Sequence, residues 1–403
     1  MEFYLSRQPV FDRQKNVFAY ELLFHRGLSS QNDAEESDYA ASSILTAGFL
    51  TIDAEVLSRG KMTFVNFTQN LLLNEVATLF PPNLIAIEIT ENMELTDQIL
   101  AVCKKLKRDG YLMVFDFNLV QADVERTLGL ADIISADLNR TGPEEIAEFM
   151  QQNDVRKVKF LARNVETIAV FDLTCDMGFT YFAGDFFAKP MITSGRNVSS
   201  HKLSYLRLLQ EINRPQINLD TLDEIVRQDV TLSYKLLSYI NSAFFGFPNQ
   251  IKTTRHALSL IGIQEAKKWL SLIALSSMGE EKTDELIVGS LIRAKFYELL
   301  APLAGLQEQS NEFFLMGLFS MLDALLDQPM SELLSNLPIS DNVKNTLLDH
   351  SSPYREVFQL ILYFEKGDWD TFRKSTEQLN LPADDLPRLY FKALTWAHRI
   401  FSR

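Results

Sequence analysis

Short apolar runs recur through the first half of the chain and alternate with segments of helical period. The runs cover residues 62–67, 84–89, 111–117, 133–137, 158–163 and 181–182. They are rich in Val, Ile and Phe and lack a regular alternation of polar residues, which is typical of strands buried on both faces. Two longer extended segments, 2–12 and 16–25, meet at Asp12–Lys15 and predict an antiparallel ribbon.

Repeated strand–helix units over about 200 residues predict a (β/α) barrel of TIM type with an antiparallel first strand. Helices are expected after Glu35–Asp38 and over 97–108, where Asp109-Gly110 ends the pattern. An open doubly wound sheet would need a glycine-rich phosphate loop after its first strand, and this sequence has none there.

The second half carries only helical patterning. A polar, non-periodic stretch at Thr193–Ser200 separates the halves, so we expect domains at 1–195 and 196–403. Helices are expected from an N-cap at Asp220 and over 231–240, 253–261, 264–275, 285–300, 312–326, 330–336, 341–348, 355–366, 369–378 and 386–401. This half is predicted to be an all-α bundle.

Composition narrows the class of protein. The chain has 403 residues and a net charge of −14, with neither half basic, which disfavours binding to nucleic-acid phosphates. Cys103 and Cys175 form no disulfide framework or metal knuckle, so we expect a reducing cytoplasm. No apolar run reaches the roughly 20 residues of a membrane helix, and residues 1–12 do not resemble a signal peptide, so no membrane is expected.

Polar side chains stand where the predicted strands end. They are Glu21, Asn66, Glu88, Asp116 and Asp137. Chemistry in a parallel barrel gathers at the carboxyl ends of its strands, and oxygen ligands from successive strands suit Mg²⁺, Mn²⁺ or Ca²⁺. Each residue is equally compatible with an ordinary polar strand end, so a metal or phosphate site and a structural rim both stay open.

Six segments resemble the signature blocks of the EAL family, cyclic-di-GMP phosphodiesterases built on a modified TIM barrel. The blocks are Arg7-Gln8-Pro9-Val10, Tyr20-Glu21-Leu22-Leu23, Val65-Asn66-Phe67-Thr68, Glu88-Ile89-Thr90-Glu91, Val165-Glu166-Thr167 and Lys189-Pro190. Active members use two divalent cations to activate water against a phosphodiester. The resemblance implies that Glu21, Asn66 and Glu88 occupy first-metal positions, and two-metal hydrolysis needs a nearly complete ligand set.

The chain departs from the family pattern at several of these places. Phe115-Asp116-Phe117-Asn118 stands where the family has paired aspartates and a glycine-rich turn, and Ser135-Ala136-Asp137 lacks the family lysine. Arg163 replaces a carboxylate, Ala183-Gly184 lacks the family glutamine, and Phe24-His25-Arg26 displaces a phosphate-binding arginine. These losses predict that Asp116, Asp137 and Glu166 are a vestigial rim without catalytic role, and that Glu21, Asn66 and Glu88 hold at most one weak cation or close the barrel by hydrogen bonds.

The second half resembles the HDOD module, a relative of HD-type phosphohydrolases, over Asp229–Ala243, Ile251–Thr253 and Ala257–Gly262. Gly317-Leu318-Phe319-Ser320-Met321 aligns with the hydrolase motif but lacks its His-Asp metal ligands. The histidines of this half, at positions 201, 256, 350 and 398, are scattered without metal-ligand spacing. Asn241-Ser242-Ala243 is interpreted as a structural turn, and Phe244–Phe247 as buried aromatics or an exposed partner-binding tip.

Together these features predict a catalytically inactive EAL–HDOD signalling scaffold that acts through contacts with other signalling proteins, in a cyclic-di-GMP-related bacterial pathway. No cofactor is expected. The first alternative is a weak Mg²⁺- or Mn²⁺-dependent cyclic-di-GMP phosphodiesterase using Glu21, Asn66, Glu88 and Asp116. The second is a sensor that binds the nucleotide without hydrolysing it. The identity of the partner, weak cyclic-di-GMP binding and a homodimer stay open.

Overall fold

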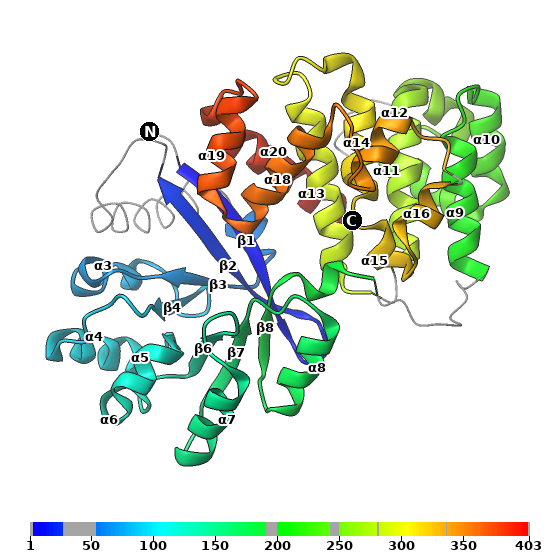
Figure 1. The fold of residues 1–403 in the computed structure, drawn as a ribbon. Helices are drawn as coiled ribbons and strands as arrows, with labels where there is room; N and C mark the ends of the chain where they lie inside the picture. The colour runs from blue at the N-terminus through cyan, green and yellow to red at the C-terminus, as the bar shows by residue number, and fades with distance from the viewer. Residues whose placement is uncertain are drawn as a thin grey trace. The chain divides into compact units, whose positions relative to one another are not determined.

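The computed structural model describes residues 3–26, 54–190, 200–241, 250–279, 282–335 and 337–401 (Figure 1). The chain separates into two compact units. The first comprises residues 1–189 with 359–403, and the second comprises residues 190–358. The helix expected after Glu35–Asp38, the expected linker apart from Ser200, and Phe244–Phe247 lie outside the described residues.

Eight strands of the first unit form a closed barrel, which confirms the predicted architecture. They are β1 Phe3–Asp12, β2 Val17–Arg26, β3 Met62–Asn66, β4 Ile85–Ile89, β5 Leu112–Asp116, β6 Ile133–Asp137, β7 Lys159–Arg163 and β8 Tyr181–Ala183. β1 runs antiparallel to both β2 and β8, and every other neighbouring pair is parallel. The ribbon of β1 and β2 is therefore the antiparallel element that the sequence predicts.

Two apolar clusters show which side chains point into the barrel. The inner cluster contains Ala19, Phe64, Ala86, Val114 and Leu161 from successive strands, and the outer one packs between the strands and the surrounding helices. Because side chains alternate along a strand, residues two positions further on in these strands also face the inside. Glu21, Asn66, Glu88, Asp116 and Arg163 are those residues.

Helices and short 3₁₀ turns connect the strands. They are α2 Ala54–Ser58, α3 Gln69–Leu73, η2 Val76–Leu79, α4 Asp97–Arg108, α5 Phe117–Ala122, α6 Val124–Thr127, α7 Pro143–Gln152, α8 Ile168–Asp176 and η3 Asp185–Ala188. The expected helix over 97–108 is confirmed, with Thr96 as its N-cap.

Gly184 joins β8 to η3 at a place where no side chain fits. Its φ is +145°, and a Cβ there would lie 2.3 Å from the carbonyl oxygen of Val165. The backbone of Val165 donates to Ala183 and accepts from Phe186, both at 3.0 Å. The glycine that the chain shares with the EAL pattern thus lets the β7 and β8 exits pack directly.

The last 45 or so residues belong with the barrel. α18 (Arg355–Lys366) begins in the second unit and continues into the first, followed by α19 (Trp369–Gln378), η5 (Ala383–Asp385) and α20 (Leu386–Phe401). Tyr4 on β1 stacks on Trp369 at 5.8 Å between ring centroids and meets Phe372 edge-on at 5.3 Å. Phe364 contacts both of these rings, and Figure 1 shows α19 beside the β1–β2 ribbon.

This grouping differs from the expected boundary, which put 196–403 in one helical domain. The helical period of residues 359–401 is as predicted, but periodicity does not say which core a helix covers. Phe372 is buried, and both it and Trp369 pack against Tyr4 of β1, so burial of apolar area assigns the segment to the first unit.

The described part of the second unit is entirely helical, as expected. Its helices are α9 Ser200–Ile212, α10 Leu219–Gln228, α11 Val230–Ile240, α12 Thr254–Met278, α13 Asp284–Leu300, η4 Gln307–Gln309, α14 Ser310–Phe319, α15 Leu322–Leu326, α16 Met330–Ser335 and α17 Asp341–Leu347. α12 breaks at Gly262, whose φ is +79° and which the sequence marked as a helix end. The N-cap expected at Asp220 is wrong, because Asn218 accepts from the amide of Thr221 instead.

No helix among these described elements is both long and apolar enough to cross a bilayer.

The grouping of the C-terminal helices can be tested at Phe372, which is 1% exposed. We expect Phe372→Ala to destabilise the first unit by about 3–5 kcal/mol because a large buried ring is lost. Hydrogen exchange should quicken in β1 and β2, while the amides of α13 and α14 keep their protection. Leu79→Ala, at a side chain 75% exposed, is the control and should leave exchange unchanged. Faster exchange in α13 and α14 instead would support the boundary expected from the sequence.

Candidate functional site

Arg163, at the end of β7, is bonded to two carboxylates inside the barrel. Its Nη1 donates to Glu21 on β2, its Nη2 donates to Glu88 on β4, and its Nε donates to the hydroxyl of Ser135 on β6. The carboxylates are 4% and 6% exposed and the arginine side chain 20%. One guanidinium therefore ties together four strands of the barrel across its interior.

The charges of this cluster are coupled. Burial, together with the neighbouring Glu21 and Asp116, raises the pKa of Glu88 to about 7, although Arg163 lowers it. Oε2 of Glu88 is buried without a partner among the described residues, which adds to the cost of its charge. Burial by itself would lower the pKa of Arg163, but Glu21 and Glu88 outweigh it and raise that pKa, so the guanidinium stays charged.

A second arginine binds two more carboxylates just beyond the strand ends. Arg140 donates to Glu91 and lies 3.6 Å from Asp137, measured from Nε to Oδ2. Asn164 donates to the same aspartate at 2.7 Å. Asn164 has a φ of +58°, a conformation that asparagine tolerates. Sequence reasoning missed Glu91 and Arg140 as site residues. The sequence feature that could have identified them is their position, two or three residues beyond the ends of β4 and β6.

Asp116 is used as a helix cap. Its Oδ1 accepts from the amide of Asn118 at 2.9 Å, so α5 begins directly after β5. The glycines of the family turn are absent here, and the chain enters a helix without an intervening loop. Burial raises the pKa of Asp116, together with the charge of Glu91.

Phe115 does not stand at the barrel mouth, although the sequence comparison placed it in a ligand position. It is fully buried in the outer cluster, where it pairs in register with Ile89 and Ile134. The inward residue at the end of β5 is Asp116, because side chains alternate along the strand. The expectation that Phe115 occupies a ligand place inside the barrel is therefore wrong, and Arg163 and Ser135 are departures from the family pattern that do face the interior.

The remaining predicted residues take different surroundings. Asn66 pairs in register with Glu88 but is exposed and makes no side-chain hydrogen bond within the described chain. Glu166 is exposed on the loop after β7, 3.9 Å from the ammonium of Lys189. The structure thus brings together Glu21, Glu88 and Asp116 and leaves Glu166 outside.

This geometry does not fit a divalent cation. A metal at Glu21 and Glu88 would compete with a buried guanidinium already bonded to both, and Asp116 is engaged by backbone amides. Across the described residues, no group of three His, Cys, Asp or Glu side chains is arranged to hold a metal ion.

An arginine also lies at the hydrolase-like motif of the second unit. Nη1 of Arg293 on α13 donates to Ser320 at 3.2 Å, and Ser320 donates to the carbonyl of Gly317 at 2.7 Å. Burial raises the pKa of the neighbouring Asp323, although the positive charge of Arg293 lowers it in part. Asn241, interpreted as structural, accepts from the amide of Ile251 at 2.7 Å and donates to its carbonyl at 2.8 Å.

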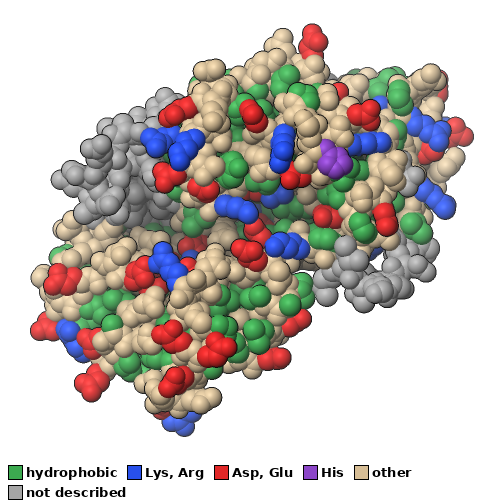
Figure 2. All heavy atoms as spheres, viewed as in Figure 1, with side chains coloured by type: hydrophobic (Ala, Val, Ile, Leu, Met, Phe, Trp, Pro, Cys, Tyr) green, Lys and Arg blue, Asp and Glu red, His purple; other side chains and the backbone are tan. Residues whose placement is uncertain are grey.

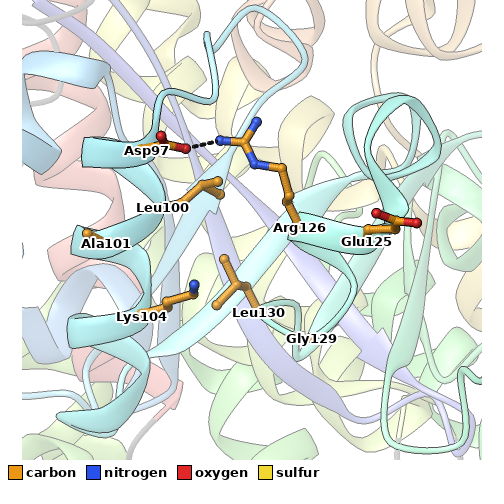
Figure 3. Close-up of a pocket in the computed structure, with 8 residues that line it drawn as sticks. All are labelled: Asp97, Leu100, Ala101, Lys104, Glu125, Arg126, Gly129 and Leu130. Carbon is orange, nitrogen blue, oxygen red and sulfur yellow. Dashed lines mark hydrogen bonds and ion pairs between the residues drawn. The ribbon is translucent and has the colours of Figure 1, made fainter.

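A hollow of about 510 Å³ lies elsewhere on the barrel, between α4 and α6 (Figure 3). Leu100, Ala101 and Leu130 line it, and Asp97 and Arg126 form an ion pair of 2.6 Å at one end. It contains none of the predicted site residues.

Two known proteins are similar to this chain over nearly its whole length. A family model described as the HDOD domain matches residues 200–331. The protein YuxH of Bacillus subtilis is 34% identical over 99% of both chains. The cyclic di-GMP phosphodiesterase CdgJ of Vibrio cholerae is 30% identical over 98% of this chain and 93% of its own length.

The solved structures compared cover at most half of the chain. An EAL domain protein from Listeria monocytogenes covers 46% of this chain and 87% of its own, at 17% identity and a TM-score of 0.35. A manganese and cyclic-di-GMP complex of BlrP1 from Klebsiella pneumoniae covers 46% of this chain and 55% of its own, at 18% identity and a TM-score of 0.37. Nothing about function follows from likenesses this weak.

The buried ion cluster predicts a non-additive mutational pattern. We expect Arg163→Met to destabilise the first unit by about 3–5 kcal/mol, because two carboxylates lose their counter-charge inside the protein. Adding Glu21→Gln and Glu88→Gln removes those charges and should recover most of the loss. Urea unfolding in a Trp269→Phe background measures this, since Trp369 and Trp396 then report the first unit.

Arg140→Met is the matched control, because its side chain is 62% exposed, and we expect an unchanged unfolding midpoint. Equal destabilisation by the single and the triple variant would mean that Arg163 acts through packing and not through charge.

The raised pKa of Glu88 predicts a pH dependence of stability. A carboxyl whose pKa is higher in the folded state contributes stability at low pH, and this contribution is lost as pH rises from the unfolded value of 4.5 through the folded value of about 7. Between pH 5 and pH 8 the free energy of unfolding should fall by about 2 kcal/mol relative to Glu88→Gln. Parallel urea titrations of the two proteins at several pH values test this, and identical pH profiles would contradict it.

Proposed function

The chain belongs to the EAL–HDOD family of its full-length relatives YuxH and CdgJ, and from that premise we propose that it is a catalytically inactive signalling scaffold in a cyclic-di-GMP-related bacterial pathway. It acts by contact with other signalling proteins and uses no metal cofactor. The carrying observation is the guanidinium of Arg163 bonded to both Glu21 and Glu88.

Two-metal hydrolysis needs negative ligands free to collect cations. Glu21 and Glu88 share one guanidinium that belongs to the protein and cannot leave, and Asp116 caps a helix. Ser135 stands at the position of the family lysine, and its hydroxyl accepts a hydrogen bond from Arg163. This arrangement supports a barrel whose former site has become a structural one.

The charge balance also argues against a nucleotide sensor. Around the strand ends the carboxylates of Glu21, Glu88, Glu91, Asp116 and Asp137 outnumber the guanidiniums of Arg140 and Arg163. A cyclic dinucleotide carries two phosphates and would be repelled there without added cations. On the face drawn in Figure 2 acidic and basic side chains are interspersed.

The enzyme remains the second candidate because CdgJ is named a cyclic di-GMP phosphodiesterase. For this chain it would require Arg163 to swing out of the barrel and leave Glu21, Glu88 and Asp116 to a metal. That motion breaks three side-chain hydrogen bonds of a mostly buried arginine, which makes it costly.

One titration separates the three functions. We expect calorimetric titration of the purified protein with cyclic-di-GMP, with and without Mn²⁺, to give no heat of binding and no linear product. CdgJ serves as the positive control for the assay. Glu88→Ala, which removes a residue that the enzyme would need, sets the background for trace contaminating activity.

Product above that background would establish the enzyme and overturn the proposal. Heat without product would establish the sensor, and would equally overturn it.

A further inference from the structure

Helix α11 has an exposed face with an unusual composition. Two of its large apolar side chains, Val230 and Tyr234, are 83% and 71% exposed, and they lie one helical turn apart. Apolar side chains exposed singly are ordinary, whereas these two are neighbours on one helix face and form one continuous apolar contact area.

The polar members of this face are neutral or basic. We define the α11 face as the exposed residues Val230, Thr231, Tyr234, Lys235 and Ser238. At about 100° per residue they fall on one arc of the helix, opposite the buried Leu232, Leu236 and Ile240. Neither the hydroxyl of Tyr234 nor the ammonium of Lys235 has a partner within the described chain.

The charge of this stretch is opposite to that of the whole protein. Between residues 230 and 264 the sequence contains Lys235, Lys252 and Arg255 and no acidic residue, in a chain of net charge −14. The nearest carboxylate in sequence, Asp229, accepts from the amides of Thr231 and Leu232 at the start of the helix. Arg255 is paired with Asp220, so the α11 face itself carries one basic side chain, Lys235, beside Tyr234 and has no carboxylate.

The face is held rigidly. Ser233 donates to the carbonyl of Val226 on α10 at 2.8 Å, Tyr239 stacks on Trp269 at 5.9 Å, and Asn241 binds the backbone of Ile251 in both directions. A helix fixed on its inner side presents its outer side chains without further ordering, which lowers the cost of binding.

We propose that the α11 face docks an acidic segment of a partner protein that inserts an apolar anchor against Val230 and Tyr234 while its carboxylates face Lys235. Tyrosine is a frequent anchor of protein interfaces, because it buries a large rigid area and keeps a polar hydroxyl. Nucleic acid and anionic membranes present many phosphates, and one or two lysines on a protein of net charge −14 do not retain them. The proposal rests on the scaffold function and names the class of partner.

The test is a selection with a phage library of random 16-residue peptides on the intact protein. We expect the enriched peptides to be rich in Asp and Glu around one or two aromatic or aliphatic residues. Their dissociation constants, measured by fluorescence polarisation, should rise at least tenfold for Tyr234→Ala and for Lys235→Glu. High salt should weaken binding to the wild type and have little effect on Lys235→Glu.

Leu79→Ala is the control, since it removes an equally exposed leucine in the other unit, and it should leave binding unchanged. Enriched peptides without acidic residues, or ones that bind the α11 variants as well as the wild type, overturn the proposal. So does a dimer in light scattering that Val230→Asp dissolves, because the occupant would then be a second copy. A positive phosphodiesterase assay would overturn the scaffold function and leave the peptide result standing.

Discussion

Inward-facing carboxylates at the end of a parallel barrel need a counter-charge. Glu21 and Glu88 come from strands that converge on the same few ångströms of interior, where water cannot screen them. The cation can be a metal taken from solution or a side chain fixed in the fold. Here it is Arg163, bonded to both carboxylates and to Ser135, so a side chain of the fold supplies counter-charge to both carboxylates.

The other charged side chains near the strand ends also have partners within the protein. Asp116 caps α5, so a helix begins directly after β5. Glu91 and Asp137 share the guanidinium of Arg140 just outside. In the second unit Arg293 donates to the hydroxyl of Ser320.

The aromatic cluster of Tyr4, Phe364, Trp369 and Phe372 makes the first unit discontinuous in sequence. Residues 359–401 follow the second unit in sequence but pack against the ribbon of β1 and β2. Glu21 lies on β2 of this ribbon. A β-ribbon that extends beyond its barrel exposes apolar side chains, and helices from the far end of the chain bury them.

Local patterning was sufficient to predict the eight strands, the antiparallel first strand and most helices of the second half, because period and strand-end chemistry are encoded by neighbouring residues. The same information pointed to Glu21, Glu88 and Asp116, and the sequence identified Arg163 as a change of charge. Other features required the tertiary structure. Whether Phe115 or Asp116 faced inward depended on the exact alignment of β5 in the sheet. A shift of one residue along the strand moves each side chain to the opposite face. The pairing of Arg163 with carboxylates 142 and 75 residues away, and the return of the last helices to β1, depended on contacts between distant segments, which no local pattern encodes.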